Sequence, residues 1–436
     1  MPLRGVRSLR HRNFRLFFAG QLVSLCGTWL QQVAMTWLVW ELSHRPSLLG
    51  YLSFASQIPM LLLAPVAGAI SEHWNRRRAL LVTQSLAMAQ ALVLGVLTLE
   101  GWVRVEHVFV LALALGMVNA FDMPLRQAFL HQMVVERDDL ANAIALNSSM
   151  VNGARLVGPA LAGVLIDLVG EGWCFVLNGL SYLAVLAALA AMQIVHVRPP
   201  VAETRLWTNL HGGFRYAFTF TPIRAILSMV AITSITSMPL SVLMPVFASE
   251  KLGGGAGTLG LLTSAMGIGA LGSAMYLAAR RSVLGLGRVM ALAALGFALG
   301  MIAFSFSDTL VLSLPILALS GFCMMLQMAS SNTLLQTIVD PDKRGRVMGL
   351  YGMSFLGVAP IGSLSTAYLA RPDVLGSSNT LRLAGAICLA GGIVFLFRLR
   401  TLREQVRPVY RKLGILPEIA AGLQASAQLN TPPERT

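Results

Sequence analysis

The sequence predicts an all-α polytopic membrane protein with twelve transmembrane helices in two repeated six-helix halves. Of its 436 residues, 56% are hydrophobic and only 12% are charged, whereas roughly a quarter of residues are charged in soluble domains. The apolar residues fall into runs of roughly 18–25, which are long enough to cross a bilayer core as helices. A soluble chain of this composition would have too little polar surface to face water.

The predicted elements follow in order after a basic segment, residues 1–13. The first six spans form an N-terminal half, residues 1–195, and fall at 14–42, 48–70, 79–99, 107–129, 142–167 and 173–195. A polar cytoplasmic linker, residues 196–222, precedes the C-terminal half, residues 223–398. Its six spans fall at 223–249, 257–279, 288–306, 309–333, 346–370 and 380–398, and a cytoplasmic tail, residues 399–436, follows.

Positive charge is distributed unevenly between the two sides of the predicted membrane. With twelve spans, 27 of the 33 lysines and arginines lie on the side of the termini, five lie on the other side, and Arg155 lies within a span. The positive-inside rule then places both termini in the cytoplasm of a multi-pass protein of the bacterial inner membrane. The net charge of +14 therefore reflects topology, and no nucleic-acid partner is expected.

Several other classes of chemistry are absent from the pattern. The four cysteines lie in apolar runs without CxxC spacing, and the few histidines lack metal-ligand spacing, so no metal or cofactor is expected. No GxxxxGK[ST] motif is present, which excludes ATP as the direct energy source on this chain. The basic N-terminus precedes a long first span and lacks a cleavage site, so it is not expected to be a signal peptide.

Residues 132–163 resemble the stretch that lies 204 residues later, without a gap. The two stretches join equivalent elements, the loop 4–5 with span 5 and the loop 10–11 with span 11. Chance matching of common residues is the alternative. Two halves related as parallel repeats predict a transporter with its substrate site near mid-membrane, where the halves meet. The matching pairs are Gln132 and Gln336, Val135 and Val339, Asp138 and Asp342, Leu146 and Leu350, Gly153 and Gly357, and Gly158 and Gly362.

The loop between spans 2 and 3, GAISEHWNRRR at residues 68–78, is a short charged hinge between two apolar runs. Gly68 would let two helices pack closely. A carboxylate at Glu72 could accept hydrogen bonds from cations and from a neighbouring helix N-terminus. The alternative is that the arginines only fix topology, and this is the interpretation for Arg78.

This loop carries the most specific resemblance to a known family. The chain, from FRLFFAGQLVS in span 1 to RGRVMGLY before span 11, resembles a major facilitator superfamily transporter of the drug:proton antiporter branch, which includes macrolide-efflux-type and enterobactin-type siderophore exporters. The conserved places of the family's Gly-x-x-x-Asp-Arg-x-Gly-Arg-Arg pattern are occupied here by Gly68, Glu72, His73, Asn75, Arg76 and Arg77.

Three of these positions depart from the family pattern. Glu72 keeps the charge of Asp on a longer arm, His73 leaves one cation uncertain, and Asn75 tolerates the left-handed backbone of a Gly. The resemblance implies the major facilitator fold. It also implies a conformational latch formed by Gly68, Glu72, Arg76 and Arg77, whose partner is the start of span 11 near Gly345.

Span 4 ends with Asn119, Asp122 and Arg126, which share one helical face because their spacings are 3 and 4. Charges in a membrane usually face protein or water. Asp122 and Arg126 are therefore predicted to form a proton-linked or gating ion pair. A purely structural pair at a helix end is the alternative.

Span 5 contains Gly153, Gly158, Pro159 and Gly163, which resemble the antiporter packing signature of this span. Small residues allow close packing, and the proline bends the helix. Arg155 lies mid-span, so it should face a cavity, a carboxylate such as Asp122, or an anionic substrate. Snorkelling to an interface is the alternative.

Two polar stripes are predicted to line the substrate cavity. One lies on span 1 and one on span 10, where thioethers could adapt to varied ligands. Ordinary core or lipid contact is the alternative for the methionines. The stripes comprise Gln21, Ser24, Thr28 and Gln31 on span 1, and Met324, Gln327, Met328 and Ser331 on span 10.

These features predict a monomeric secondary-active exporter of amphipathic small molecules, either drugs or a secreted metabolite such as a siderophore. It would work by alternating access, with protons as the coupling ion and the lipid bilayer as its surroundings. Asp122 is the first candidate for the proton-binding carboxylate and Glu41 the second. A uniporter or lipid transporter on the same fold is the alternative. A membrane enzyme would need arranged Ser/His pairs or paired acids within the spans, and a receptor would need a signalling domain, so neither is expected.

Overall fold

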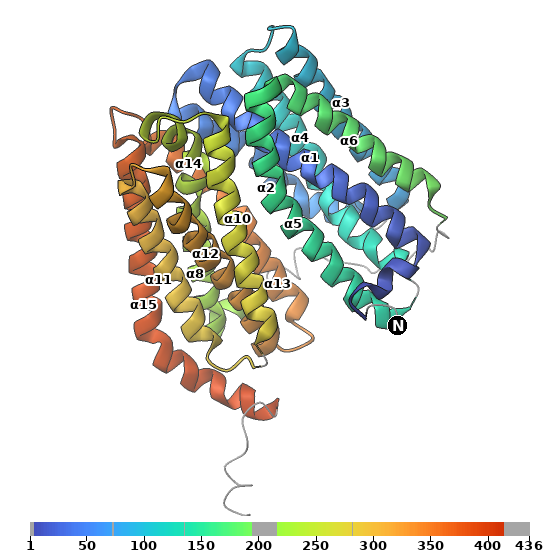
Figure 1. The fold of residues 1–436 in the computed structure, drawn as a ribbon. Helices are drawn as coiled ribbons and strands as arrows, with labels where there is room; N and C mark the ends of the chain where they lie inside the picture. Colours follow the sequence, from blue (N-terminus) through green and yellow to red (C-terminus); the bar gives the residue numbers. More distant parts are fainter. Residues whose placement is uncertain (1–3, 72–73, 135, 194–215, 281, 414–436) are drawn as a thin grey trace, which may run out of the picture.

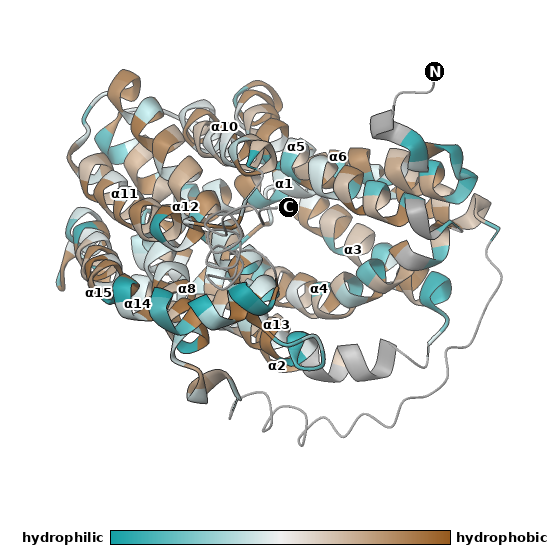
Figure 2. Ribbon diagram, turned by 90° about the horizontal axis from the view of Figure 1, so that it is seen from below, coloured by the Kyte–Doolittle hydropathy of each residue, from teal (hydrophilic) through white to brown (hydrophobic). Residues whose placement is uncertain are grey.

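The computed structural model describes residues 4–71, 74–134, 136–193, 216–280 and 282–413. In these ranges, twelve helical segments are long and apolar enough to cross a membrane, as the sequence predicts. They form two groups that lie side by side (Figure 1). Seen from the end that carries the N-terminus, hydrophobic residues dominate most helix flanks (Figure 2), as a lipid-facing surface requires. Most of the predicted linker, 196–222, lies outside the described residues.

A short 3₁₀ helix, Arg4–Arg10, precedes the first group of helices. The first group consists of six long helices, each of which is one predicted span. They are α1 (Arg12–Ser43), α2 (Pro46–Ser71), α3 (Arg76–Leu99), α4 (Val105–Met133), α5 (Arg137–Val169) and α6 (Glu171–Ala191).

The second group also provides six spans, but two of these are interrupted. It comprises α8 (Thr221–Val242), α9 (Met244–Val246), α10 (Ala256–Ala279), α11 (Leu286–Phe306), α12 (Leu310–Ile338), α13 (Arg344–Gly352), α14 (Ala359–Leu369) and α15 (Gly376–Lys412). A π-helical turn, Phe247–Lys251, follows α9, and a second, Met353–Gly357, joins α13 to α14.

Prolines accompany both interruptions. Pro245 lies at the start of α9 and Pro360 at the start of α14, where neither can donate a backbone hydrogen bond to the preceding turn. The irregular turn before α14 finds a partner on α8, because the Ser234 hydroxyl donates to the Phe355 carbonyl. Such broken helices are tolerated where a neighbouring helix satisfies the freed backbone groups.

The last helix is longer than predicted. The predicted span ends at residue 398, but α15 continues to Lys412, so the first part of the predicted tail is helical. Leu399, Leu402, Val406 and Tyr410 recur at spacings of 3, 4 and 4 and form one apolar face. Figure 1 shows this part of α15 turning beneath the second group of helices.

The two halves pack together through α5 against α10 and α2 against α14. The α5–α10 contact is close because both helices present glycine: a Cβ on Gly163 would lie 3.1 Å from the Cα of Gly260. The α2–α14 contact is also close at a glycine, since a Cβ on Gly50 would lie 2.7 Å from the Cα of Ala367. These contacts lie toward the end of the bundle opposite the N-terminus, and we call this the distal end.

The span 5 glycines have different surroundings. A Cβ on Gly158 would lie 2.4 Å from the Cβ of Trp29 on α1, so this glycine packs within the N-terminal half. Gly163 packs across the halves, and the Pro159 carbonyl lies beside Gly260. Gly153 has nothing within 4 Å of its Cβ position, so its predicted packing role is wrong in this structure.

Candidate substrate cavity and buried ion pair

Asp122 and Arg126 form a buried ion pair one turn apart on α4. The Asp122 side chain is only 3% exposed, and its carboxylate also accepts hydrogen bonds from Thr83 Oγ1 at 2.8 Å and Gln84 Nε2 at 2.7 Å, both on α3. A buried carboxylate needs such donors to offset the loss of water. The predicted ion pair is therefore present, and it also joins α3 to α4.

Arg126 extends this network to α1. Its Nη1 donates to Gln21 Oε1 at 3.0 Å, and Gln21 is itself buried. Arg126 Nε is buried and has no hydrogen-bond partner among the described residues. Any change in the charge of Asp122 would therefore act directly on a side chain that links α4 to α1.

A second polar chain crosses the same half. Asn178 Nδ2 on α6 donates to Gln31 Oε1 on α1 at 2.6 Å, and Gln31 Nε2 donates to Gln90 Oε1 on α3 at 2.8 Å. All three side chains are buried. Buried amides are costly unless they are paired, so this chain fixes the relative rotation of α1, α3 and α6.

A cavity of about 250 Å³ lies beside this second chain and is bounded by both halves. Its wall combines apolar side chains with uncharged polar ones and contains no ionisable acid or base except the Tyr182 phenol. Such a wall suits an amphipathic ligand that is oriented by a few hydrogen bonds. The lining residues include Thr28, Gln31, Gln57, Asn119, Asn178 and Tyr182 from the N-terminal half and Ser241 from α8.

Tyr182 connects the cavity with the ion pair. It lines the cavity and lies close to Thr28, Asn178 and the Asp122–Arg126 pair. A ligand that displaced Tyr182 would therefore change the surroundings of the ion pair.

The predicted stripe on α1 is divided between these two sites. Thr28 and Gln31 line the cavity, whereas Gln21 belongs to the ion-pair network and Ser24 is buried. The Ser24 carbonyl accepts a hydrogen bond from Thr28 at 2.9 Å. The stripe thus joins the two sites along one helix.

The predicted stripe on α12 does not line this cavity. Gln327, Met328 and Ser331 are buried, and Met324 is half-buried, because α10 and α11 pack against α12. Both polar atoms of Gln327 lack a partner among the described residues. The spacing correctly indicates one helical face but cannot say whether a neighbouring helix covers it.

Arg155 does not pair with Asp122, so that predicted pairing is wrong. Asp122 already contacts Arg126, and no described carboxylate lies within 4.0 Å of Arg155. The Arg155 guanidinium lies 5.7 Å from the ring centroid of Trp29 on α1. A cation over an aromatic face retains some electrostatic stabilisation without a carboxylate.

The arginines of the predicted latch contact their own half. Arg76 Nη1 donates to the Ala128 carbonyl at 3.3 Å, and Arg77 donates to the Leu189 and Ala190 carbonyls, each at 2.7 Å. Both therefore bind carbonyls near helix C-termini, a favourable position for a cation. The expected contact of these two arginines with the start of span 11 is not made here.

The structure describes only some of the remaining residues of this loop. Gly68 lies in α2, and Glu72 and His73 lie outside the described residues. Asn75 does not adopt the left-handed backbone that asparagine tolerates, because its φ of −68° and ψ of 103° are those of an extended residue. Its side chain instead caps α3 by accepting from the Arg78 backbone N–H at 3.1 Å.

Sequence reasoning missed several partners of these sites. Thr83, Gln84 and Gln90 are polar residues in an apolar run on α3. Thr83 and Gln90 are seven residues apart and therefore share one helical face, which was a signal that could have found them. At the distal end, Asp167 Oδ2 on α5 accepts from the Gly257 backbone N–H on α10 at 3.1 Å. No sequence pattern indicated that contact between the halves.

Comparison with known proteins agrees with this architecture. Residues 5–417 match the family described as transmembrane secretion effector. The chain is 25% identical to the staphyloferrin A transporter of Staphylococcus aureus, over 89% of this chain and 97% of that protein. It is 26% identical to the multidrug efflux pump Tap of Mycolicibacterium fortuitum, over 90% and 98% respectively.

Solved structures agree on the fold alone. A peptide transporter POT superposes with a TM-score of 0.72 at 10% identity, covering 90% of this chain and 95% of that one. The nucleoside transporter NupG gives 0.66 at 14% identity, covering 91% and 99%. The family and its relatives are transporters, not enzymes. This chain belongs to the transmembrane secretion effector family of major facilitator superfamily transporters.

Proposed function

We propose that this efflux or secretion transporter exports amphipathic small molecules by alternating access and is driven by proton antiport. The observation that carries the proposal is the buried Asp122–Arg126 pair, which Tyr182 connects to a cavity bounded by both halves. An intramembrane carboxylate paired with a cation is a site where a proton can be taken up and released.

The orientation follows from charge. The excess of lysine and arginine on the side of the termini supports cytoplasmic termini in a bacterial inner membrane. The distal end then faces the periplasm. Close α5–α10 and α2–α14 packing at that end supports an inward-facing state, in which the central cavity communicates with the cytoplasm.

Proton binding to Asp122 would couple to substrate through Arg126. A neutral Asp122 no longer holds Arg126, whose Nη1 also contacts Gln21 on α1. Rearrangement of Arg126 would then move charge next to Tyr182 and the cavity. Proton and substrate would thus favour different states of the Asp122–Arg126 pair, and antiport requires such opposed preferences.

The predicted latch in the loop between spans 2 and 3 would form in the outward-facing state. We infer that Glu72, Arg76 and Arg77 engage the start of α13 when the cytoplasmic end closes, and that Gly68 would allow the close helix approach that this requires. In the present state, carbonyls of α4 and α6 hold the two arginines. Closure would exchange some of these contacts for contacts between the halves.

Export of a siderophore is the second candidate. Arg155 supports it, because an intramembrane cation without a described carboxylate partner could bind an anionic group of a substrate. One relative is a staphyloferrin A transporter, and a siderophore is itself a small secreted molecule.

Everted membrane vesicles test the proposal. Ethidium and staphyloferrin A serve as probes for the drug and siderophore classes, each with and without an imposed pH gradient. We expect vesicles with the wild-type chain to accumulate one probe when the lumen is acidic and to lose it when the gradient is collapsed. Accumulation that ignores the gradient would contradict antiport, and the probe that accumulates would decide between the two classes.

A further inference from the structure

The end of α15 borders an apolar pocket of about 450 Å³ at the same end of the molecule as the N-terminus. The start of α8, the start of α11 and the end of α12 form its other walls. Leu402, Phe395 and Ile338 are almost fully buried there and form an apolar surface. This pocket is separate from the central cavity, and the two share no lining residue.

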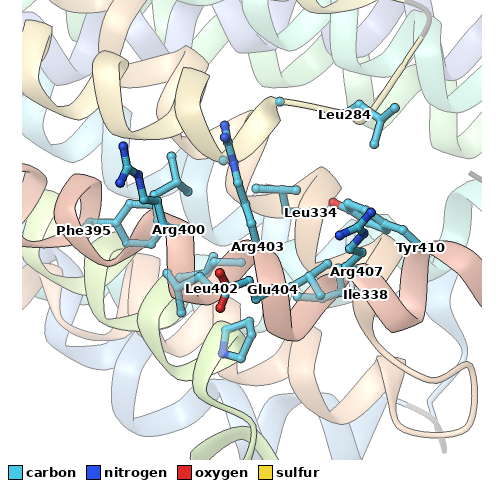
Figure 3. A pocket seen from close by; sticks show the side chains of 16 residues that line it. Leu284, Leu334, Ile338, Phe395, Arg400, Leu402, Arg403, Glu404, Arg407 and Tyr410 are labelled. Carbon is cyan, nitrogen blue, oxygen red and sulfur yellow. The ribbon is translucent and has the colours of Figure 1, made fainter. Parts of the chain in front are cut away.

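Three arginines line this pocket. Arg400, Arg403 and Arg407 have spacings of 3 and 4, so they follow one flank of the helix directly beside its apolar face. In Figure 3 their guanidinium groups lie on the Leu284 side of the helix, whereas the Glu404 carboxylate lies on the other side. The pocket therefore has an apolar interior and a basic rim.

The charges of these arginines are not neutralised within the described chain. Glu404 lies four residues from Arg400 and three from Arg407, spacings that permit helical ion pairs. Yet no described carboxylate oxygen lies within 4.0 Å of any of the three guanidinium groups. With Glu404 counted, the lining retains an excess of two positive charges.

The length of α15 places this rim at the depth of lipid headgroups. A helix of 37 residues is about 55 Å long. The hydrocarbon core takes about 20 residues. Within α15 the uninterrupted apolar run covers residues 383–397, between Arg382 and Arg398, and Arg398 is the first of a series of basic residues. The three pocket arginines then lie at the membrane–water boundary.

We propose that this pocket binds an anionic phospholipid of the surrounding leaflet, whose phosphate contacts Arg400, Arg403 and Arg407 and whose acyl chain lies against Phe395 and Leu402. Basic pockets between transmembrane helices at this depth suit such headgroups. A free phosphate would leave the apolar surface unused. The proposal does not depend on which substrate the protein exports.

Native mass spectrometry of the full-length protein tests the proposal. Phosphatidylglycerol and phosphatidylcholine with the same acyl chains are titrated onto delipidated protein, and the bound fraction is measured. We expect phosphatidylglycerol to bind at lower concentration. Combined Arg400→Gln, Arg403→Gln and Arg407→Gln substitutions should weaken its binding about tenfold or more, whereas binding of phosphatidylcholine should not change.

Matched variants make the test specific. Arg288→Gln, Arg346→Gln and Lys412→Gln together remove the same charge from exposed positions outside the pocket, and this control should bind as the wild type does. Glu404→Gln should strengthen phosphatidylglycerol binding a few-fold. If the triple pocket variant does not fold, Arg403→Gln and Glu404→Gln alone provide the test, because their effects should have opposite signs.

Several results would overturn the proposal. Equal binding of the two lipids, equal losses in the pocket and control variants, or no lipid retained by the wild type would each do so. The last result would point to another segment of the chain as occupant. Displacement of the lipid by excess inorganic phosphate, to the same extent as by soluble short-chain phosphatidylglycerol, would indicate a free-anion site instead.

Discussion

Arg126 lies against the Asp122 carboxylate one turn away on α4, and the same guanidinium reaches Gln21 on α1. A single charged side chain therefore holds together the α1 and α4 helices of the N-terminal half. Because Thr83 and Gln84 also bind Asp122, the pair is a buried network rather than a surface salt bridge. Its members should respond together when one of them is changed.

The first prediction concerns the stability of this network. Arg126→Ala should lower the unfolding free energy by about 3–5 kcal/mol, because Asp122 would remain as an unpaired buried charge. The double variant Asp122→Asn with Arg126→Gln should recover part of this loss. Thermal unfolding followed by tryptophan fluorescence measures both. A double variant less stable than Arg126→Ala would contradict the explanation by unpaired charge.

The second prediction concerns the amide chain beside the cavity. Gln31→Ala removes the partner of both Gln90 and Asn178 and should weaken binding of the transported substrate by about fivefold or more. Gln127→Ala serves as control, because this glutamine is exposed on α4 and does not line the cavity. Equilibrium binding to purified protein measures the effect. Equal substrate affinities of the two variants would show that Gln31 does not contribute to substrate binding.

The third prediction concerns closure at the distal end. Gly163→Leu should prevent the close α5–α10 contact, since a Cβ there already meets Ala256 and Gly260. Gly153→Leu is the matched control on the same helix, where a Cβ meets nothing within 4 Å. A cysteine introduced by Ser241→Cys in the cavity reports access of an impermeant thiol reagent from the periplasm. Labelling should increase with Gly163→Leu alone, and equal labelling with both would contradict the role of this contact.

The fourth prediction compares neighbouring arginines in the loop 2–3. Arg77→Gln should cost about 1–2 kcal/mol of stability, because Arg77 binds two carbonyls near the end of α6. Arg78 is exposed and has no ion pair among the described residues, so Arg78→Gln should change stability little. Thermal unfolding measures both variants. An equal loss for both would assign the effect to net charge rather than to helix capping.

The sequence predicted the spans well because their length and apolar character depend on the bilayer and not on tertiary detail. The Asp122–Arg126 pair was predictable for a similar reason, since residues four apart on a helix are neighbours. The helix continues beyond the predicted span end at 398, because hydrophobicity ends there while the amphipathic spacing continues to Lys412.

Contacts between distant helices could not be predicted in the same way. The α12 stripe was placed in the cavity, but packing against α10 and α11 buries it. Asp122 was one candidate partner for Arg155 because both are charges in a membrane, whereas Arg126 occupies that carboxylate. Gly153 and Gly163 look alike in the sequence, and only the position of α10 distinguishes them. One helix predicts its own faces, but not which neighbour covers each face.

In the proposed mechanism, Asp122 couples substrate movement to protons. Everted vesicles test this coupling by a comparison of Asp122→Asn with the wild type, for whichever probe the wild type accumulates. Two rates are recorded, accumulation driven by a pH gradient and exchange of labelled for unlabelled substrate without one. Asp122→Asn should lose gradient-driven accumulation and keep exchange. Gradient-driven accumulation at the wild-type rate would show that Asp122 is not the coupling carboxylate.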